Sequence, residues 1–186
     1  GVVAGRGVWW RVRTYDSDGM PSPWSAPARF EMGLLGAEDW QAAWIGGELT
    51  GSPATAVPAV LLARDFALQQ PASEARLSLA VLGACVAEIN GQPVEQDPLG
   101  AAWHDYRERV TYRVLDVTGH LQTGANRIGV LLGDGFYCGS LGGGQRQQYG
   151  ERPWLRAQLV MHFPGGERRM IVSDGSWQWR PSWVLR

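Results

Sequence analysis

The residues that could do chemistry lie in two segments of this 186-residue chain, Asp97 to Tyr106 and Asp134 to Tyr149. Both segments combine carboxylates with aromatic rings, and the second is also rich in glycine. Carboxylates and amides exchange hydrogen bonds with sugar hydroxyls, while an aromatic ring covers the apolar face of a sugar. The segments therefore predict carbohydrate binding, with packing against a neighbouring domain as the alternative. The candidate binding residues are Asp97, Trp103, Asp105, Asp134, Phe136, Tyr137 and Arg146.

Independent hydrolysis is poorly supported by the same residues. A glycosidase needs two carboxyl groups that flank the scissile bond, and nothing in the sequence pairs Asp105 with Asp134. No G-x-S-x-G nucleophile motif is present, and the three histidines are too far apart for a zinc pair. Loop carboxylates such as Asp97 could ligate calcium, although no EF-hand spacing supports this. We expect the chain by itself to be catalytically inactive.

Composition excludes several classes of partner. All 17 basic residues are arginine, and the formal net charge is −1, so we expect neither nucleic acid nor an anionic membrane as a partner. The chain is 45% hydrophobic without a run long enough to span a bilayer, and residues 1–7 do not resemble a signal peptide. Cys85 and Cys138 are too few for a disulfide framework, and we expect both to be buried apolar fillers. A soluble globular protein is expected.

From residue 59 onward the sequence predicts an all-β domain. Short alternating segments follow one another at regular spacing, and no helix of ten or more residues is visible. Asn90-Gly91 between apolar residues is the strongest hairpin signal in the chain. The predicted architecture is a jelly-roll, galactose-binding-like β-sandwich. Strands are predicted at 60–66, 75–81, 85–89, 110–117, 126–132, 155–163, 168–172 and 176–180.

The N-terminal part predicts a strand pair, at 8–15 and 28–32. The pattern from Trp10 to Phe30, with its D-S-D-G turn and P-S-P-W-S loop, resembles the last two strands of a fibronectin type III domain. Such a sandwich has about seven strands, so we expect exposed strand edges here and self-association through them. The predicted domains are 1–34 for these strands, 35–58 for a linker and 59–186 for the sandwich. Within the linker we expect a helical turn at 37–40 and an anchor at Trp44-Ile45.

Several motifs together resemble the N-terminal domain of bacterial α-L-rhamnosidases. They are E-I-N-G at 88–91, W-H-D-Y-R-E-R-V at 103–110, Y-R-V-L-D-V-T at 112–118 and N-R-I-G-V-L-L-G-D-G-F-Y at 126–137. Phe136 stands where the family usually has Trp. The fibronectin-like strands and the connector at 38–46 occur in the same order in that family. The resemblance covers nearly the whole chain.

The resemblance implies a parent enzyme whose reaction is carried by a separate (α/α)6 barrel further toward the C-terminus. That barrel hydrolyses terminal α-L-rhamnose with inversion, so the implied partners are rhamnose-containing glycosides and the barrel of the same chain. This chain has no counterpart of the catalytic residues. The sandwich is then expected to recognise carbohydrate, and the alternative is a purely structural module that packs against the barrel.

Calcium is the one cofactor that the resemblance raises. In some relatives the loop after the Asn-Gly hairpin binds rhamnose with the help of calcium. Here that loop is Val94 to Leu99, with Asp97 as the candidate calcium ligand. Gln96 replaces an acidic or amide side chain, and Ala101-Ala102 replace a Pro-Gly pair. These departures argue against calcium in this chain.

Overall fold

Two compact units make up the computed structural model, which describes residues 3–95 and 103–183. The units are Gly1–Gln41 and Ala42–Arg186. The strands of both units pair antiparallel, as the sequence predicted. In the described part of the chain, no helix has both the length and the apolar character needed to cross a membrane.

The first unit contains the predicted strand pair. Strand β1 (Gly7–Trp10) pairs antiparallel with β2 (Ala28–Glu31). The first strand is shorter than the predicted 8–15, because the opposite chain carries prolines, which cannot donate to a ladder. Beyond Trp10 the serine hydroxyls of Ser25 and Ser22 accept hydrogen bonds from the backbone N–H groups of Val12 and Thr14. The expected helical turn is present as a 3-10 helix, η1 (Ala37–Asp39).

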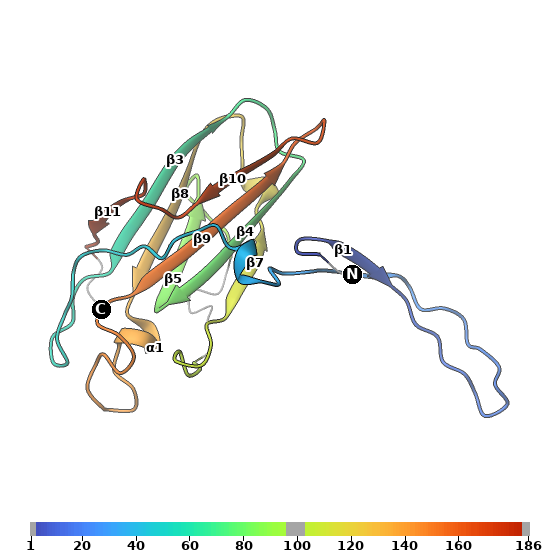
Figure 1. Ribbon diagram of the computed structural model, residues 1–186, viewed down its shortest axis with the longest axis horizontal. Helices are drawn as coiled ribbons and strands as arrows, with labels where there is room; N and C mark the ends of the chain where they lie inside the picture. The colour runs from blue at the N-terminus through green and yellow to red at the C-terminus, as the bar shows by residue number, and fades with distance from the viewer. Residues whose placement is uncertain (1–2, 96–102, 184–186) are drawn as a thin grey trace. The chain divides into compact units, whose positions relative to one another are not determined.

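The second unit is a β-sandwich of two antiparallel sheets that lie face to face (Figure 1). One sheet has the order β10-β9-β4-β7 and the other the order β11-β3-β8-β5-β6. This confirms the predicted all-β sandwich. The strands are β3 (Val60–Leu68), β4 (Glu74–Leu82), β5 (Ala84–Ile89), β6 (Gln92–Pro93), β7 (Tyr112–Asp116), β8 (Gly124–Gly133), β9 (Trp154–His162), β10 (Arg168–Val172) and β11 (Gln178–Pro181). Two short helices, η2 (Thr118–His120) and α1 (Gly135–Cys138), complete the unit.

Period-two alternation explains the core between the sheets. Alternate side chains of each strand point to the same face of a sheet, and every second residue of β4 from Ala75 to Val81 is buried. On β8 the same alternation buries Ile128, Val130 and Leu132. Cys85 and Cys138 are also buried free thiols, and this burial raises the pKa of Cys85 to about 11 and that of Cys138 to about 12. Both cysteines are buried, as expected, and Cys85 Sγ also accepts a hydrogen bond from Arg113 Nη2 at 3.5 Å.

The end of the linker packs on the sandwich. Ile45 forms a two-way backbone bridge with Leu155, with both N–H to O distances at 2.8 Å. The Arg156 side chain adds a 2.8 Å hydrogen bond to the carbonyl of Ala42. The predicted anchor at Ile45 is confirmed, whereas its neighbour Trp44 is 36% exposed.

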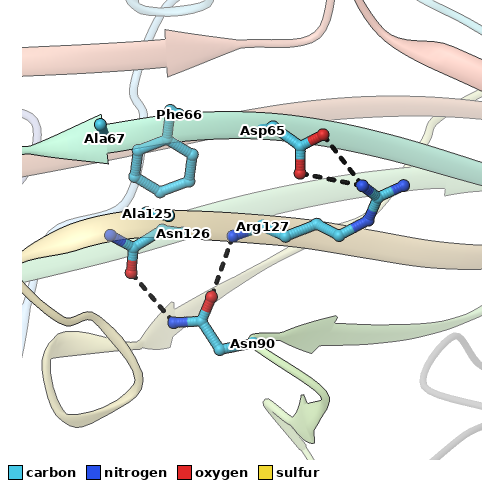
Figure 2. Close-up of a pocket in the computed structure, with 7 residues that line it drawn as sticks. All are labelled: Asp65, Phe66, Ala67, Asn90, Ala125, Asn126 and Arg127. Carbon is cyan, nitrogen blue, oxygen red and sulfur yellow. Dashed lines mark hydrogen bonds and ion pairs between the residues drawn. The ribbon is translucent and has the colours of Figure 1, made fainter.

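The predicted hairpin at Asn90-Gly91 is present, and its asparagine ties together three segments. Both residues have positive φ, 55° and 77°, as a two-residue hairpin turn between β5 and β6 requires. Figure 2 shows Asn90 between Asn126 and Arg127, where its amide donates to Asn126 Oδ1 at 2.9 Å and accepts from the Arg127 backbone at 2.9 Å. Asn126 is 3% exposed and makes further bonds to the backbone of Gln122 and Gly124.

We expect Asn126→Ala to lower the free energy of unfolding by about 1 to 3 kcal/mol, because the substitution leaves buried polar partners without a bond. Urea denaturation followed by Trp fluorescence measures the change. Gln70→Ala is the control, since the side chain of Gln70 makes only one long, exposed contact of 3.5 Å among the described residues. Equal stability of the two variants would show that Asn126 does not lock this end of the sandwich.

Candidate functional site

Three loops gather at the end of the sandwich where β8 leaves its sheet (Figure 1). They are the loop at 46–58, the loop at 103–110 and the loop at 134–150, and we refer to them together as the loop end. The third loop begins with α1, which packs closely on the β4–β5 turn. A Cβ on Gly135 would lie 2.5 Å from the backbone of Gly83, and Gly135 has a φ of +50°, so only glycine fits there.

An aromatic cluster forms the centre of the loop end. Tyr106 is only 8% exposed, and its ring centroid lies 5.3 Å from that of Tyr137 and 5.2 Å from that of Tyr149. The His104 ring lies 4.3 Å from Tyr106 on the same loop. Gly150 makes room for this packing, because a Cβ there would lie 2.3 Å from the Tyr137 ring. These contacts bring the second and third loops together.

The hydroxyl of Tyr106 is the unusual polar group of this cluster. It is buried and has no hydrogen-bond partner in the described part of the chain. Burial raises the pKa of both Tyr106 and Tyr137, so their hydroxyls stay protonated and can donate. An unpaired buried hydroxyl costs about 1 to 3 kcal/mol, so the packing of Tyr106 in this cluster lowers the stability by about that amount.

Asp105 and Arg107 form an ion pair at the exposed rim of the cluster. The carboxylate accepts from Arg107 Nε at 2.9 Å and from Nη2 at 2.7 Å, in a bidentate arrangement. Hydrogen bonds from Arg107 lower the pKa of Asp105 to about 2. The same guanidinium lies 5.4 Å from the ring centroid of Tyr149, which is a cation–π distance. Asp105 therefore orients Arg107 over the aromatic cluster.

Arg146 joins the loop at 134–150 to the loop at 46–58. Its side chain is 4% exposed and forms an ion pair with the Asp134 carboxylate. The other terminal nitrogen donates to the carbonyls of Ser52, at 2.9 Å, and Thr55. The backbone N–H of Arg146 also donates to Pro53 at 3.1 Å. Arg146 and Asp134 thus hold the loops in place from inside.

The predicted site residues therefore take different positions. Trp103 and Phe136 expose their side chains, at 59% and 44%, while Tyr137 lies in the aromatic cluster. Asp105 is at the rim, and Asp134 and Arg146 are internal. Asp97 lies outside the described residues.

Sequence reasoning did not single out Tyr106, Tyr149 or His104 as site residues. Their only signal was that they fall inside or at the ends of the two predicted segments. No local pattern shows that these rings meet.

The described residues do not fit a metal site. No group of three or more His, Cys, Asp or Glu side chains comes together among residues 3–95 and 103–183. The two candidate carboxylates of the loop end, Asp105 and Asp134, are each bound by an arginine. Calcium chemistry is therefore not supported by these side chains.

Asp105 is not arranged as a general acid. A general acid in glycoside hydrolysis needs a raised pKa, whereas the pKa of Asp105 is lowered to about 2 by its hydrogen bonds with Arg107. The arrangement at the loop end can donate and accept hydrogen bonds and offer aromatic surface.

A second hollow lies at the opposite end of β8, around the asparagine pair of Figure 2. Its polar side chains are largely engaged with one another. Arg127 Nη1 contacts both carboxylate oxygens of Asp65 at 2.9 Å, and Asn90 and Asn126 bond each other. This hollow therefore has few free polar groups to offer a ligand.

Two protein-family models match the sequence. The alpha-L-rhamnosidase N-terminal domain matches residues 70–186, and the Rha78A-like, N-terminal immunoglobulin domain matches residues 3–36. The second match supports the N-terminal strand pair. Immunoglobulin and fibronectin type III domains share the sandwich architecture that the sequence suggested for this pair.

Individual relatives agree with the family models. An α-L-rhamnosidase from Alteromonas sp. (strain LOR) is 30% identical over 96% of this chain and 20% of its own length. The crystal structure of native α-L-rhamnosidase from Aspergillus terreus superposes with a TM-score of 0.85 and 33% identity, covering 96% of this chain and 21% of that one. The chain thus spans about a fifth of the length of these relatives.

A further solved structure shares the fold. It is that of the Streptomyces avermitilis α-L-rhamnosidase complexed with L-rhamnose, with a TM-score of 0.89 and 20% identity. The match covers 97% of this chain and 34% of that one.

We expect Arg146→Ala to lower the free energy of unfolding by about 3 kcal/mol, because it leaves the Asp134 carboxylate buried without its cation. Denaturant unfolding measures the loss, and hydrogen exchange should rise in both 46–58 and 134–150. Arg107→Ala is the control, since the exposed pair with Asp105 should contribute little stability. Unchanged exchange in the loop at 46–58 would contradict the role of Arg146.

Proposed function

The chain belongs to the α-L-rhamnosidase N-terminal domain family and corresponds to the non-catalytic N-terminal part of these enzymes, and from that premise we propose that its loop end recognises carbohydrate. The parent protein would then be an α-L-rhamnosidase that hydrolyses terminal α-L-rhamnose, with the catalytic barrel in the same chain. In this proposal the loop end holds a rhamnose-containing glycoside near that barrel.

One observation carries the proposal: the exposed Arg107 guanidinium lies at cation–π distance from the Tyr149 ring, at the rim of the cluster of aromatic rings. Arg107 uses Nε and Nη2 to bind Asp105, so its remaining N–H groups can donate to a sugar hydroxyl. The exposed ring of Trp103, close in sequence, supplies an apolar surface for the C–H face of a sugar.

L-rhamnose is the first ligand to test, since one protein of the same fold is known complexed with it. We expect saturable heat when L-rhamnose is titrated into the chain by calorimetry. Trp103→Ala should weaken binding by up to about tenfold, because an aromatic contact contributes about 0.5 to 1.5 kcal/mol. Trp183→Ala is the control, since that ring is also exposed, at 88%, but lies outside the three loops.

The titration is repeated with calcium and then with a chelator. Because Gln96 and Ala101-Ala102 depart from the sequence of the calcium-assisted relatives, we expect the heat to be the same in both. Absence of heat in every condition would contradict carbohydrate recognition. It would favour the alternative of a structural module that docks on the barrel, for which exposed rings such as Phe136, at 44%, are the supporting observation.

We also propose that the first unit self-associates through its strands. Its pair of strands is only four residues long on each side, and Trp9, Trp10 and Phe30 are 68%, 48% and 45% exposed. Short ribbons with free edges and apolar rings tend to pair with other strands.

Sedimentation velocity over a concentration series should therefore show the average mass rising above that of one chain. Trp9→Lys should reduce the association, since a charge on an edge strand opposes pairing. A constant monomeric mass at the highest concentration would refute this proposal.

A further inference from the structure

The outer face of the five-stranded sheet carries a small polar hollow, distinct from the loop end. Its position follows from the strand register. Ala63 of β3 stands opposite Gly129 of β8, Gln178 of β11 stands opposite Ala63, and Glu88 of β5 stands opposite Gly129. Across the sheet, this row therefore carries the amide of Gln178, the methyl group of Ala63, no side chain at Gly129 and the carboxylate of Glu88. Ala63 and Gly129, at the centre of the row, have the smallest side chains, so the surface is depressed between Gln178 and Glu88.

Larger side chains border the hollow on the two neighbouring rows of the same face. Leu61 lies two residues before Ala63 on its strand, and Arg127 lies two residues before Gly129 on the other. With Trp179 and Arg180 of β11 they complete the lining of a space of about 170 Å³. Pockets for drug-sized ligands are about 300 to 1,000 Å³, so this hollow suits a single ring.

The polar side chains of the hollow are free to bind. Those of Glu88, Gln178 and Arg180 make no hydrogen bond or ion pair within the described part of the chain. Arg127 contacts Asp65 through Nη1 alone and keeps its other nitrogen atoms available. This contrasts with the hollow of Figure 2, where the asparagines bond one another.

The carboxylate of Glu88 lies directly over Gly129. A Cβ on Gly129 would lie 2.8 Å from Glu88 Oε1 and 3.0 Å from its Cγ. The absence of a side chain at position 129 therefore lets the carboxylate bend over the sheet. A larger residue at 129 would displace Glu88 and fill the space.

Charge balance indicates the class of ligand. Two arginines, Arg127 and Arg180, are matched by two carboxylates, Glu88 and Asp65, so the rim does not select a charged molecule. Carboxylate acceptors beside guanidinium and amide donors suit a ring with several hydroxyls. Leu61 and Ala63 offer an apolar bed for the C–H face of such a ring.

We infer that this hollow is a second carbohydrate subsite, which takes one neutral sugar ring on the sheet face. The inference rests on the proposed carbohydrate recognition for its ligand class. The site itself is independent of the loop end. Glu88 accepts from the sugar hydroxyls, and Arg127, Gln178 and Arg180 donate to them.

The test is a titration of L-rhamnose into the ¹⁵N-labelled chain, followed by NMR. We expect shifts of the backbone amides of Ala63 and Gly129 and of the Gln178 side-chain amide. Gly129→Val should abolish the shifts around Ala63 and leave those of the loop end intact. Ala125→Val is the matched control, because residue 125 lies on the same strand and the same face but outside the hollow.

Glu88→Gln provides a second variant that keeps the shape of the side chain. It replaces a charged acceptor with a neutral one, and we expect binding at the sheet face to weaken several-fold. The spectrum itself shows whether each variant is folded.

The outcomes separate the two proposals. Shifts at the loop end alone would overturn the sheet-face subsite and leave the proposed function standing. Shifts at the sheet face alone would support the subsite and overturn the assignment of recognition to the loop end. No shift in either place would overturn both.

Discussion

The buried guanidinium of Arg146 is the interaction on which the loop end depends. A cation in the interior is costly unless it is paired, and here its two terminal nitrogens bind the Asp134 carboxylate and the carbonyls of Ser52 and Thr55. These partners come from two loops that are far apart in the sequence. Neither loop can move away without uncovering the charge, so both are held to the end of the sandwich.

The aromatic cluster follows from that constraint. Asp134 directly follows strand β8, and Tyr137 lies on α1, where its ring contacts that of Tyr106. At Gly150 the backbone passes close to the Tyr137 ring, and a side chain at position 150 would collide with that ring. The rings are thus positioned by two sheets and an ion pair, so the proposed binding site is ordered by the fold itself. A site ordered in advance loses less entropy on binding.

Local patterns in the sequence were sufficient for most of the fold. Alternation identified the strands from β3 to β11, except for the two-residue β6. Asn90-Gly91 identified the turn between β5 and β6, because the signal for such a turn is confined to two residues. The site could be predicted only as two segments. The bond from Arg146 to Ser52 joins residues 94 apart, and nothing near either residue encodes the other. The same is true of Tyr106 and Tyr149, whose contact exists only after the sheets have formed.

The charged side chains at the rim of the loop end are arranged for hydrogen bonding. A carboxylate bound by arginine keeps its charge and directs the arginine, as Asp105 does for Arg107. Docking on another domain would favour a continuous apolar surface. The exposed rings of the loop end are those of Trp103 and Phe136, and the exposed Arg107 guanidinium belongs to the same end. The sheet face offers the polar side chains of Glu88 and Gln178. Free donors and acceptors beside small apolar surfaces match the surface of a sugar, which is why we propose recognition rather than docking.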